Sequence, residues 1–169
     1  MKDKETLASL LKGEIQQSRP FRSIEEALLL SLMRTTEALI NALVQLLKVE
    51  GLSQPQYNVL RILRGAGEQG RSCSEIGERL VARVPDITRL LDRLEARDLI
   101  RRERSLKDRR VMTSWITPKA LEILARLDGP MHEMLSNSFA GMDELAREQL
   151  LEHSETLRSL LNARNTQSK

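Results

Sequence analysis

Residues 78–117 read ERLVARVPDITRLLDRLEARDLIRRERSLKDRRVMTSWIT, and this stretch decides the fold. Its first half has apolar residues at i, i+3, i+4 and i+7, the spacing of one helical face. These residues are Ile87, Leu90, Leu91 and Leu94. Its second half places a basic turn between residues 99–104 and 111–116, whose β-branched and aromatic content suits strands. A helix followed by a basic hairpin is the outline of a winged helix.

The face of this helix opposite the apolar stripe is polar. At about 100° per residue it carries Pro85, Thr88, Arg89 and Asp92, with Asp86 and Arg93 on its flank. Such side chains can bond to phosphates and to the edges of bases. We expect Pro85 to occupy the first helical turn and Asp86 to favour the positive end of the helix. Asp86 repels phosphates but can accept a hydrogen bond from a cytosine amino group.

Positive charge is concentrated in the same stretch. From Arg79 to Arg110 there are eleven Lys or Arg and six Asp or Glu, a surplus of five, whereas the whole chain has a net charge of +3. Lys and Arg supply most non-specific DNA affinity because they neutralise phosphates. The concentration therefore favours a nucleic-acid surface. The alternative is a solvated helix face with internal pairs such as Arg89 with Asp92.

The segment Thr88–Ile100, followed by Asp108-Arg109-Arg110 and closed by Ile116-Thr117, resembles the MarR family of transcriptional regulators. The resemblance implies that Arg110, with Arg109, enters the minor groove and that Asp108 braces the wing. Two positions depart from the family pattern. Residues 83–86 replace a serine cap and small polar residues, which bears on base preference, and Asp98 stands where glycine is common.

Polar residues of the helix-turn-helix and the hairpin are the candidates for DNA binding. They are Ser72, Ser74, Pro85, Asp86, Thr88, Arg89, Arg93, Lys107, Asp108, Arg109 and Arg110. Aromatic residues make up only 2% of the chain, so platforms for stacking unpaired bases are not expected. The predicted partner is double-stranded DNA.

Helical signals flank this stretch on both sides. A long helix is predicted from Ile24 to about Val49, with an apolar face wide enough for burial on two sides, and Gly51 ends it. Capping boxes at residues 53–56 and 72–75 begin two further helices. The second of these forms a helix-turn-helix with the recognition helix, through a turn at residues 81–84.

The chain after the hairpin is also predicted to be helical. Pro118 opens a helix that the Gly129-Pro130 pair should kink or break, and Asp143 caps the last helix. The fold class expected is mainly α with a small β-hairpin wing. The organisation expected is an N-terminal arm (1–23), a first long helix for core and dimerisation (24–50), the winged helix-turn-helix (51–117), C-terminal dimerisation helices (118–162) and a frayed tail (163–169).

Catalytic, metal and membrane features are not expected. We find no glycine-rich phosphate loop and no supported nucleophile triad, and His132 and His153 lack metal-ligand spacing. We therefore expect no enzyme activity and no cofactor. The charged residues 1–12 do not form a secretory signal, and no apolar run is expected to span a membrane. Cys73, the one cysteine, excludes an intrachain disulfide and fits a reducing cytoplasm. Its place in a first helical turn leaves both oxidation sensing and an inert role open.

Two functions follow as hypotheses. The first is a dimeric regulator, a repressor that binds pseudo-palindromic duplex DNA and responds to a ligand or a stress signal. By the family resemblance, its effector would be a small aromatic or phenolic compound between the first helix, the second helix around Tyr57 and the helix after the wing. The second hypothesis is a protein-interaction module whose basic hairpin binds an acidic protein partner.

Overall fold

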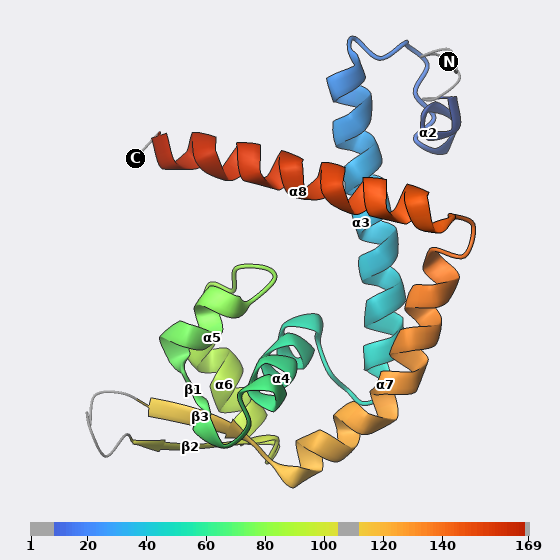
Figure 1. Cartoon of the computed structure of the whole chain (residues 1–169). Coiled ribbons are helices and arrows are strands. Elements are labelled where there is room, and N and C mark those ends of the chain that lie inside the picture. Colours follow the sequence, from blue (N-terminus) through green and yellow to red (C-terminus); the bar gives the residue numbers. More distant parts are fainter. Residues whose placement is uncertain (1–8, 105–111, 168–169) are drawn as a thin grey trace. The chain divides into compact units, whose positions relative to one another are not determined.

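The computed structural model describes residues 9–104 and 112–167 (Figure 1). The helices are α2 (Ser9–Glu14), α3 (Ile24–Lys48), α4 (Gln54–Ala66), α5 (Cys73–Arg79), α6 (Ile87–Glu95), α7 (Pro118–Ser138) and α8 (Glu144–Gln167). A short 3-10 turn, η1 (Gly67–Gln69), and the strands β1 (Arg71–Ser72), β2 (Ile100–Arg104) and β3 (Met112–Ile116) complete the order. The prediction of a mainly α fold with a hairpin wing is confirmed. The chain divides into two compact units, Met1–Asp128 and Gly129–Lys169.

The sheet has three antiparallel strands in the order β1-β3-β2. The predicted hairpin pairs β2 with β3, from Ile100 opposite Ile116 to Arg104 opposite Met112. The third strand was not predicted. β1 has two residues, with Arg71 opposite Ser114, and a strand this short has no alternating pattern that a sequence could reveal.

The helices begin at the predicted caps. The side chains of Ser53 and Ser72 each accept from the backbone N–H three residues on, and Gln56 and Glu75 accept in return from the cap N–H. Both predicted capping boxes are therefore present. Between α5 and α6, Gly77 permits close packing, because a Cβ atom there would lie 2.6 Å from Ile87 Cδ1.

The end of α3 is bound to two later elements. Leu52 N–H donates to the Leu47 carbonyl at 3.1 Å and Gly51 N–H to the Lys48 carbonyl at 3.0 Å. The last residue of the helix is Lys48, and the turn at Gly51, whose φ is +63°, stops it as predicted. The guanidinium of Arg97, just past α6, donates to the carbonyls of Glu50 (3.1 Å) and Gly51 (2.8 Å). Lys119 of α7 donates to the Arg97 carbonyl at 2.8 Å. Arg97 thus bonds the two carbonyls of the turn that follows α3.

The core of the first unit joins the helices to the base of the hairpin. Its largest fully buried apolar side chains are Leu47, Val59, Leu60, Leu63, Ile76, Leu91, Leu94, Leu99, Ile100 and Leu124. They come from α3, α4, α5, α6, β2 and α7, together with Leu99 just before β2. The predicted apolar stripe of the recognition helix is therefore buried at Leu90, Leu91 and Leu94, while Ile87 is half-buried.

The helices of the C-terminal part are longer than predicted. α7 continues through Gly129 and Pro130 to Ser138, so of the predicted kink or break the break does not occur. A proline removes one backbone donor, but the following residues still hold helical angles. The predicted tail at residues 163–169 is helical as far as Gln167, because no glycine or proline follows Asn162 and each added residue extends the helix.

One helix among the described residues, α3, is long and apolar enough by length and composition to cross a membrane. The expectation that no apolar stretch reaches this length is therefore wrong. Core helices of soluble proteins have the same length and composition. Leu47, near the end of α3, is completely buried in the first unit.

Candidate nucleic-acid interface

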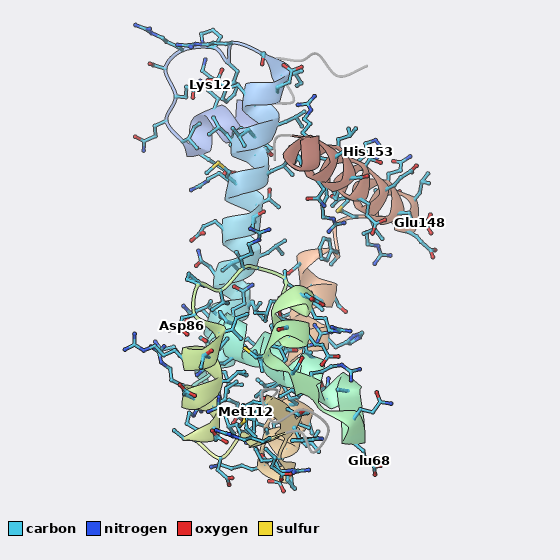
Figure 2. The ribbon with its side chains drawn as sticks, turned by 90° about the vertical axis from the view of Figure 1, so that its left-hand side faces the viewer. Lys12, Glu68, Asp86, Met112, Glu148 and His153 are labelled. Atoms are coloured by element: carbon cyan, nitrogen blue, oxygen red, sulfur yellow. The ribbon has the colours of Figure 1, made fainter. Side chains whose placement is uncertain are left out.

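Helix α6 separates a buried face from a polar one. Leu91 and Leu94 point into the core, whereas Thr88, Arg89 and Arg93 are exposed. None of the described residues pairs with the Arg89 or Arg93 guanidinium. Figure 2 shows Asp86 at the start of this helix and Met112 at the start of β3, away from Lys12 of α2. The polar face predicted from the helical period is thus exposed.

The start of α6 differs from the prediction. Asp86 is the N-cap, and its carboxylate accepts from the Arg89 backbone N–H at 2.8 Å. Pro85 precedes the cap and does not lie in the first turn, so that expectation is wrong. The carboxylate is a better cap than the proline ring because it can accept from an unpaired helix N–H. Bonding of Asp86 to a cytosine would therefore compete with the cap.

Asp98 lies in the turn that ends α6 and has an unusual backbone conformation. Its φ is +57°, in the left-handed region that favours glycine. Asp98 N–H donates to the Glu95 carbonyl at 2.8 Å and Leu99 N–H to the Leu94 carbonyl at 3.0 Å. These two bonds form the helix ending for which glycine is the usual residue. Asp98 therefore carries a backbone cost that the family's glycine avoids.

Arg102 of β2 is bound to the recognition helix and is only half-exposed. Its Nε donates to Glu95 Oε2 at 2.8 Å, and its Nη2 donates to Glu95 Oε2 at 2.6 Å and to Asp92 Oδ1 at 2.5 Å. The hydrogen bond to Glu95 raises the pKa of the Arg102 guanidinium, and Asp92 adds to the effect. Asp92, placed on the polar face by the helical period, is therefore turned toward the sheet.

Arg101 lies on the other face of the hairpin. Its guanidinium stands 4.4 Å from the centroid of the Trp115 ring and pairs with Glu103. The Trp115 Nε1 in turn donates to the Glu68 carbonyl at 2.9 Å. The exposed basic side chains without a partner among residues 9–104 and 112–167 therefore include Arg83, Arg89, Arg93 and Arg104.

The two candidate serines of α5 differ. The Ser72 hydroxyl accepts from Glu75 N–H at 3.3 Å and donates to Glu75 Oε2 at 2.8 Å, so it is engaged within the cap. The backbone N–H of Ser72 lowers the pKa of the Glu75 carboxyl, and the Ser72 hydroxyl adds to the effect. Ser74 is exposed in the first turn of α5. Cys73 between them is half-buried, and its sensing role stays a prediction.

The tip of the hairpin lies outside the described residues. The four candidates Lys107, Asp108, Arg109 and Arg110 fall in this gap. The strands that carry the tip are described and are five residues long on each side. Among residues 9–104 and 112–167, no cluster of three or more His, Cys, Asp or Glu could hold a metal ion.

Two hollows lie on the first unit. One of about 90 Å³ is bounded by Leu43 of α3, by Tyr57 and Arg61 of α4, and by residues 80–82 after α5. The hollow shares α3 and the surroundings of Tyr57 with the predicted effector pocket, but no residue of α7, the third predicted wall, lines it. Burial raises the pKa of the Tyr57 phenol, so it is protonated at neutral pH. Asn58 Oδ1 accepts from Val81 N–H at 2.9 Å and fixes this turn.

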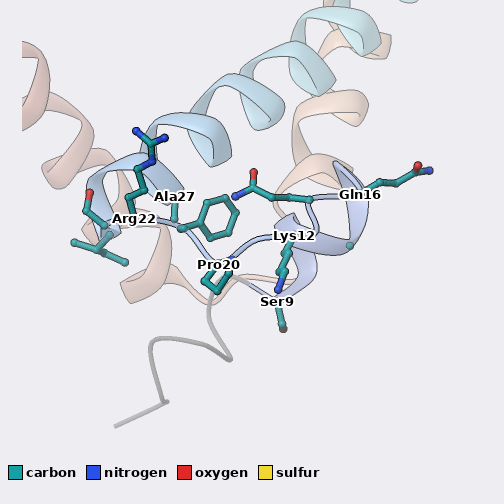
Figure 3. A pocket seen from close by; sticks show the side chains of 11 residues that line it. Ser9, Lys12, Gln16, Pro20, Arg22 and Ala27 are labelled. Carbon is teal, nitrogen blue, oxygen red and sulfur yellow. The ribbon is translucent and has the colours of Figure 1, made fainter.

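The second hollow, of about 1030 Å³, lies between α2 and the start of α3 (Figure 3). Its lining combines Lys12 and Arg22 with Pro20, Phe21 and Ala27. It was not predicted, because the pattern of residues 1–23 indicated only an arm. It lies at the opposite end of α3 from the candidate interface.

Known proteins match this arrangement. The model of the MarR family matches residues 52–112. The HTH-type transcriptional regulator TtmR of Methylorubrum extorquens (strain PA1) is 32% identical over 143 residues, which are 85% of this chain and 71% of that protein.

Solved structures agree with the sequence matches. The crystal structure of a MarR transcription factor from Planctomyces limnophilus superposes with a TM-score of 0.63 at 32% identity, covering 82% of this chain and 98% of that one. The complex of S. aureus MepR with DNA has a TM-score of 0.70 at 21% identity, covering 76% and 95%. At that identity the second likeness concerns the fold alone.

Proposed function

This chain belongs to the MarR family of DNA-binding transcriptional regulators, and we propose that it is a homodimeric repressor of pseudo-palindromic duplex DNA. The observation that carries the proposal is the exposed face of α6, where Thr88, Arg89 and Arg93 stand opposite the buried side chains of Leu90, Leu91 and Leu94. A helix with one buried and one polar face can enter a major groove without disturbing its own core. We place its action in the cytoplasm, where Cys73 stays reduced.

The candidate residues divide into two roles under this proposal. Arg89 would read a base edge, since an arginine fork matches the two acceptors of guanine. Arg93 and Ser74 would bond phosphates, and Arg110, with Arg109, would enter the minor groove beside Lys107. Ser72 is the weakest of the set because its hydroxyl is engaged with Glu75. Phosphate contacts position the protein, and base contacts specify the site.

The test is selection of bound sequences from a random DNA pool, followed by affinity measurements on the selected duplex. We expect Arg89→Ala to cost about 1–3 kcal/mol and to relax base preference at one position of each half-site. The double charge reversal Arg109→Glu with Arg110→Glu should abolish binding. Arg19→Ala, which removes one positive charge from the arm, is the control and should bind as wild type. Binding unchanged in all three variants would favour an acidic protein partner instead.

The dimer rests on unburied apolar surface. None of the described side chains of α8 is buried, and Leu150, Leu157, Leu160 and Leu161 share one side of this helix. In the first unit, α3 likewise leaves Leu28, Leu29 and Met33 exposed. A second copy would cover these faces and present two half-sites about one helical turn apart. Sedimentation as a monomer at micromolar concentration would contradict the dimer.

We further propose a small aromatic or phenolic effector at the hollow beside Tyr57. About 90 Å³ is too small for such a ligand as it stands, so binding must displace the turn at residues 80–82 that precedes α6. This displacement would couple the ligand to the recognition helix. Salicylate is a suitable probe for calorimetric titration. We expect the Tyr57→Leu variant to lose salicylate binding and to keep DNA binding. If salicylate released DNA equally from the wild-type protein and from Tyr57→Leu, this hollow would be excluded as the effector site.

A further inference from the structure

The hairpin packs on several elements of the first unit: β3 contacts α4, α5, η1 and β1, and β2 contacts α6. At its base Leu99 and Ile100 are buried, and along β3 only the two residues of β1 pair with it. A two-stranded ribbon is marginally stable without further support. The contacts between β2 and α6 are the ones that bear directly on the angle between the hairpin and the recognition helix.

Arg102 stands at the middle of β2 and faces the helices. Successive strand residues point to opposite faces, so Arg102 shares its face with Ser114, its partner across the ladder, which is buried. Arg101 and Trp115 occupy the other face. One edge of the Arg102 guanidinium is held, because Nε meets Glu95 and Nη2 meets both Glu95 and Asp92. The arginine therefore joins the midpoint of the hairpin to the second half of α6.

Arg102 is poorly placed to contact DNA itself. Its side chain is 15% exposed, whereas Arg89 and Arg93 of the same surface are exposed. The Nε and Nη2 donors of this guanidinium are engaged with the two carboxylates and are not free for a phosphate. In this position it also neutralises Asp92 and Glu95, two charges that would repel a phosphate backbone.

We propose that Arg102 is a positioning residue for DNA recognition: by holding Asp92 and Glu95 it fixes the angle between α6 and the wing, so that both enter adjacent grooves at once. The inference rests on the proposed DNA binding. A fixed angle means that contacts in the second groove need no further ordering once the first is occupied. Loss of the clamp leaves α6 intact and releases the hairpin.

The experiment compares four proteins on one selected duplex: wild type, Arg102→Gln, Arg102→Lys and the triple variant Asp92→Asn, Glu95→Gln, Arg102→Gln. The triple variant removes the clamp and also removes the two carboxylates, so it separates geometry from charge. Arg102→Lys keeps the charge but loses the two-pronged bond. Thermal unfolding and circular dichroism select variants that remain folded.

We expect Arg102→Gln and the triple variant each to bind about tenfold more weakly, with Arg102→Lys between them and wild type. Because fewer phosphates are contacted, the slope of log affinity against log salt should become shallower. Hydroxyl-radical footprints should lose protection at the minor groove beside each half-site and keep the protection under α6. A general loss of stability would weaken both footprints together.

Wild-type affinity in the triple variant would overturn the proposal, since it would mean that Arg102 only masks charge. Wild-type affinity in Arg102→Gln would overturn it as well. Both results differ from failure of the proposed function. If the proposed DNA binding itself were wrong, the wild-type protein would not bind the duplex and Arg89→Ala would leave its affinity for the duplex unchanged.

Discussion

The winged-helix part of the first unit and helix α8 differ in how far their leucine side chains are buried. Leu60, Leu63 and Leu94 are completely buried within one chain, whereas Leu145 and Leu151 of α8 are 62% and 61% exposed. The winged-helix part therefore buries these leucine side chains within one chain, and α8 does not. The comparison teaches that the core of the winged-helix part closes within one chain, whereas α8 leaves its apolar side chains available to the proposed second copy.

The largest expected effect is on the stability of the winged-helix part. Leu94→Ala removes a fully buried side chain between α6 and the core, so we expect a loss of about 2–5 kcal/mol in the free energy of unfolding. Denaturant unfolding at several protein concentrations measures it. The loss should be the same at each concentration, because the contact lies within one chain. A loss below about 1 kcal/mol would show that this core is not closed as described.

The second prediction concerns the exposed leucine side chains of α8 and the proposed dimer. Leu150→Glu with Leu157→Glu places two charges on the apolar side of α8, and we expect the dimer dissociation constant to rise by about a hundredfold. Analytical ultracentrifugation measures it. Ser159→Glu, on the opposite side of the same helix, is the matched control and should sediment as wild type. A dimer that survives the double substitution would exclude α8 as the interface.

A smaller effect concerns the ion pair between Glu50 and Arg126. Both Arg126 nitrogens that face the carboxylate lie 2.8 Å from it, and this hydrogen bonding lowers the pKa of Glu50. A lowered folded-state pKa contributes stability that is present above the unfolded value of about 4.3 and is lost as the pH falls through the folded value.

Glu50→Gln should therefore be less stable than wild type at pH 7, and the difference should disappear as the pH falls from about 5 to 3. Urea unfolding across this range measures the difference. Glu148→Gln on α8 is the control and should follow the wild-type pH dependence. A difference between Glu50→Gln and wild type that persists unchanged at pH 3 would contradict an electrostatic origin.

The smallest effect is a gain. Asp98→Gly relieves a left-handed backbone and should stabilise the protein by about 0.5–1 kcal/mol, while Asp98→Ala should not. Thermal unfolding of both variants checks the sign. DNA affinity should not change, since Asp98 lies at the end of α6 remote from Arg89.

Most of the fold could be predicted from short-range sequence patterns. The caps at Ser53 and Ser72, the stop at Gly51 and the buried stripe of α6 each depend on residues a few positions apart, so the sequence predicts them. What it could not predict depends on distant partners. Arg97 contacts carbonyls 46 and 47 positions earlier, and β1 needs β3 to exist.

The candidate site divides in the same way. The helical period placed Thr88, Arg89 and Arg93 on an exposed face, and the structure agrees. The period also placed Asp92 there, but Arg102, ten residues later, turns it toward the sheet. A charge count cannot separate arginines that bind structural partners from those left for a ligand, and that separation needed coordinates.

Trp115 gives the wing a built-in optical reporter. It is the one tryptophan of the chain, its indole N–H bonds the Glu68 carbonyl, and the Arg101 guanidinium lies over its ring. Emission from the intact protein, excited at the red edge of its absorption, therefore comes from the base of the hairpin alone. Any tilt of the hairpin changes the surroundings of this one indole, so wing movement can be followed in solution without a label.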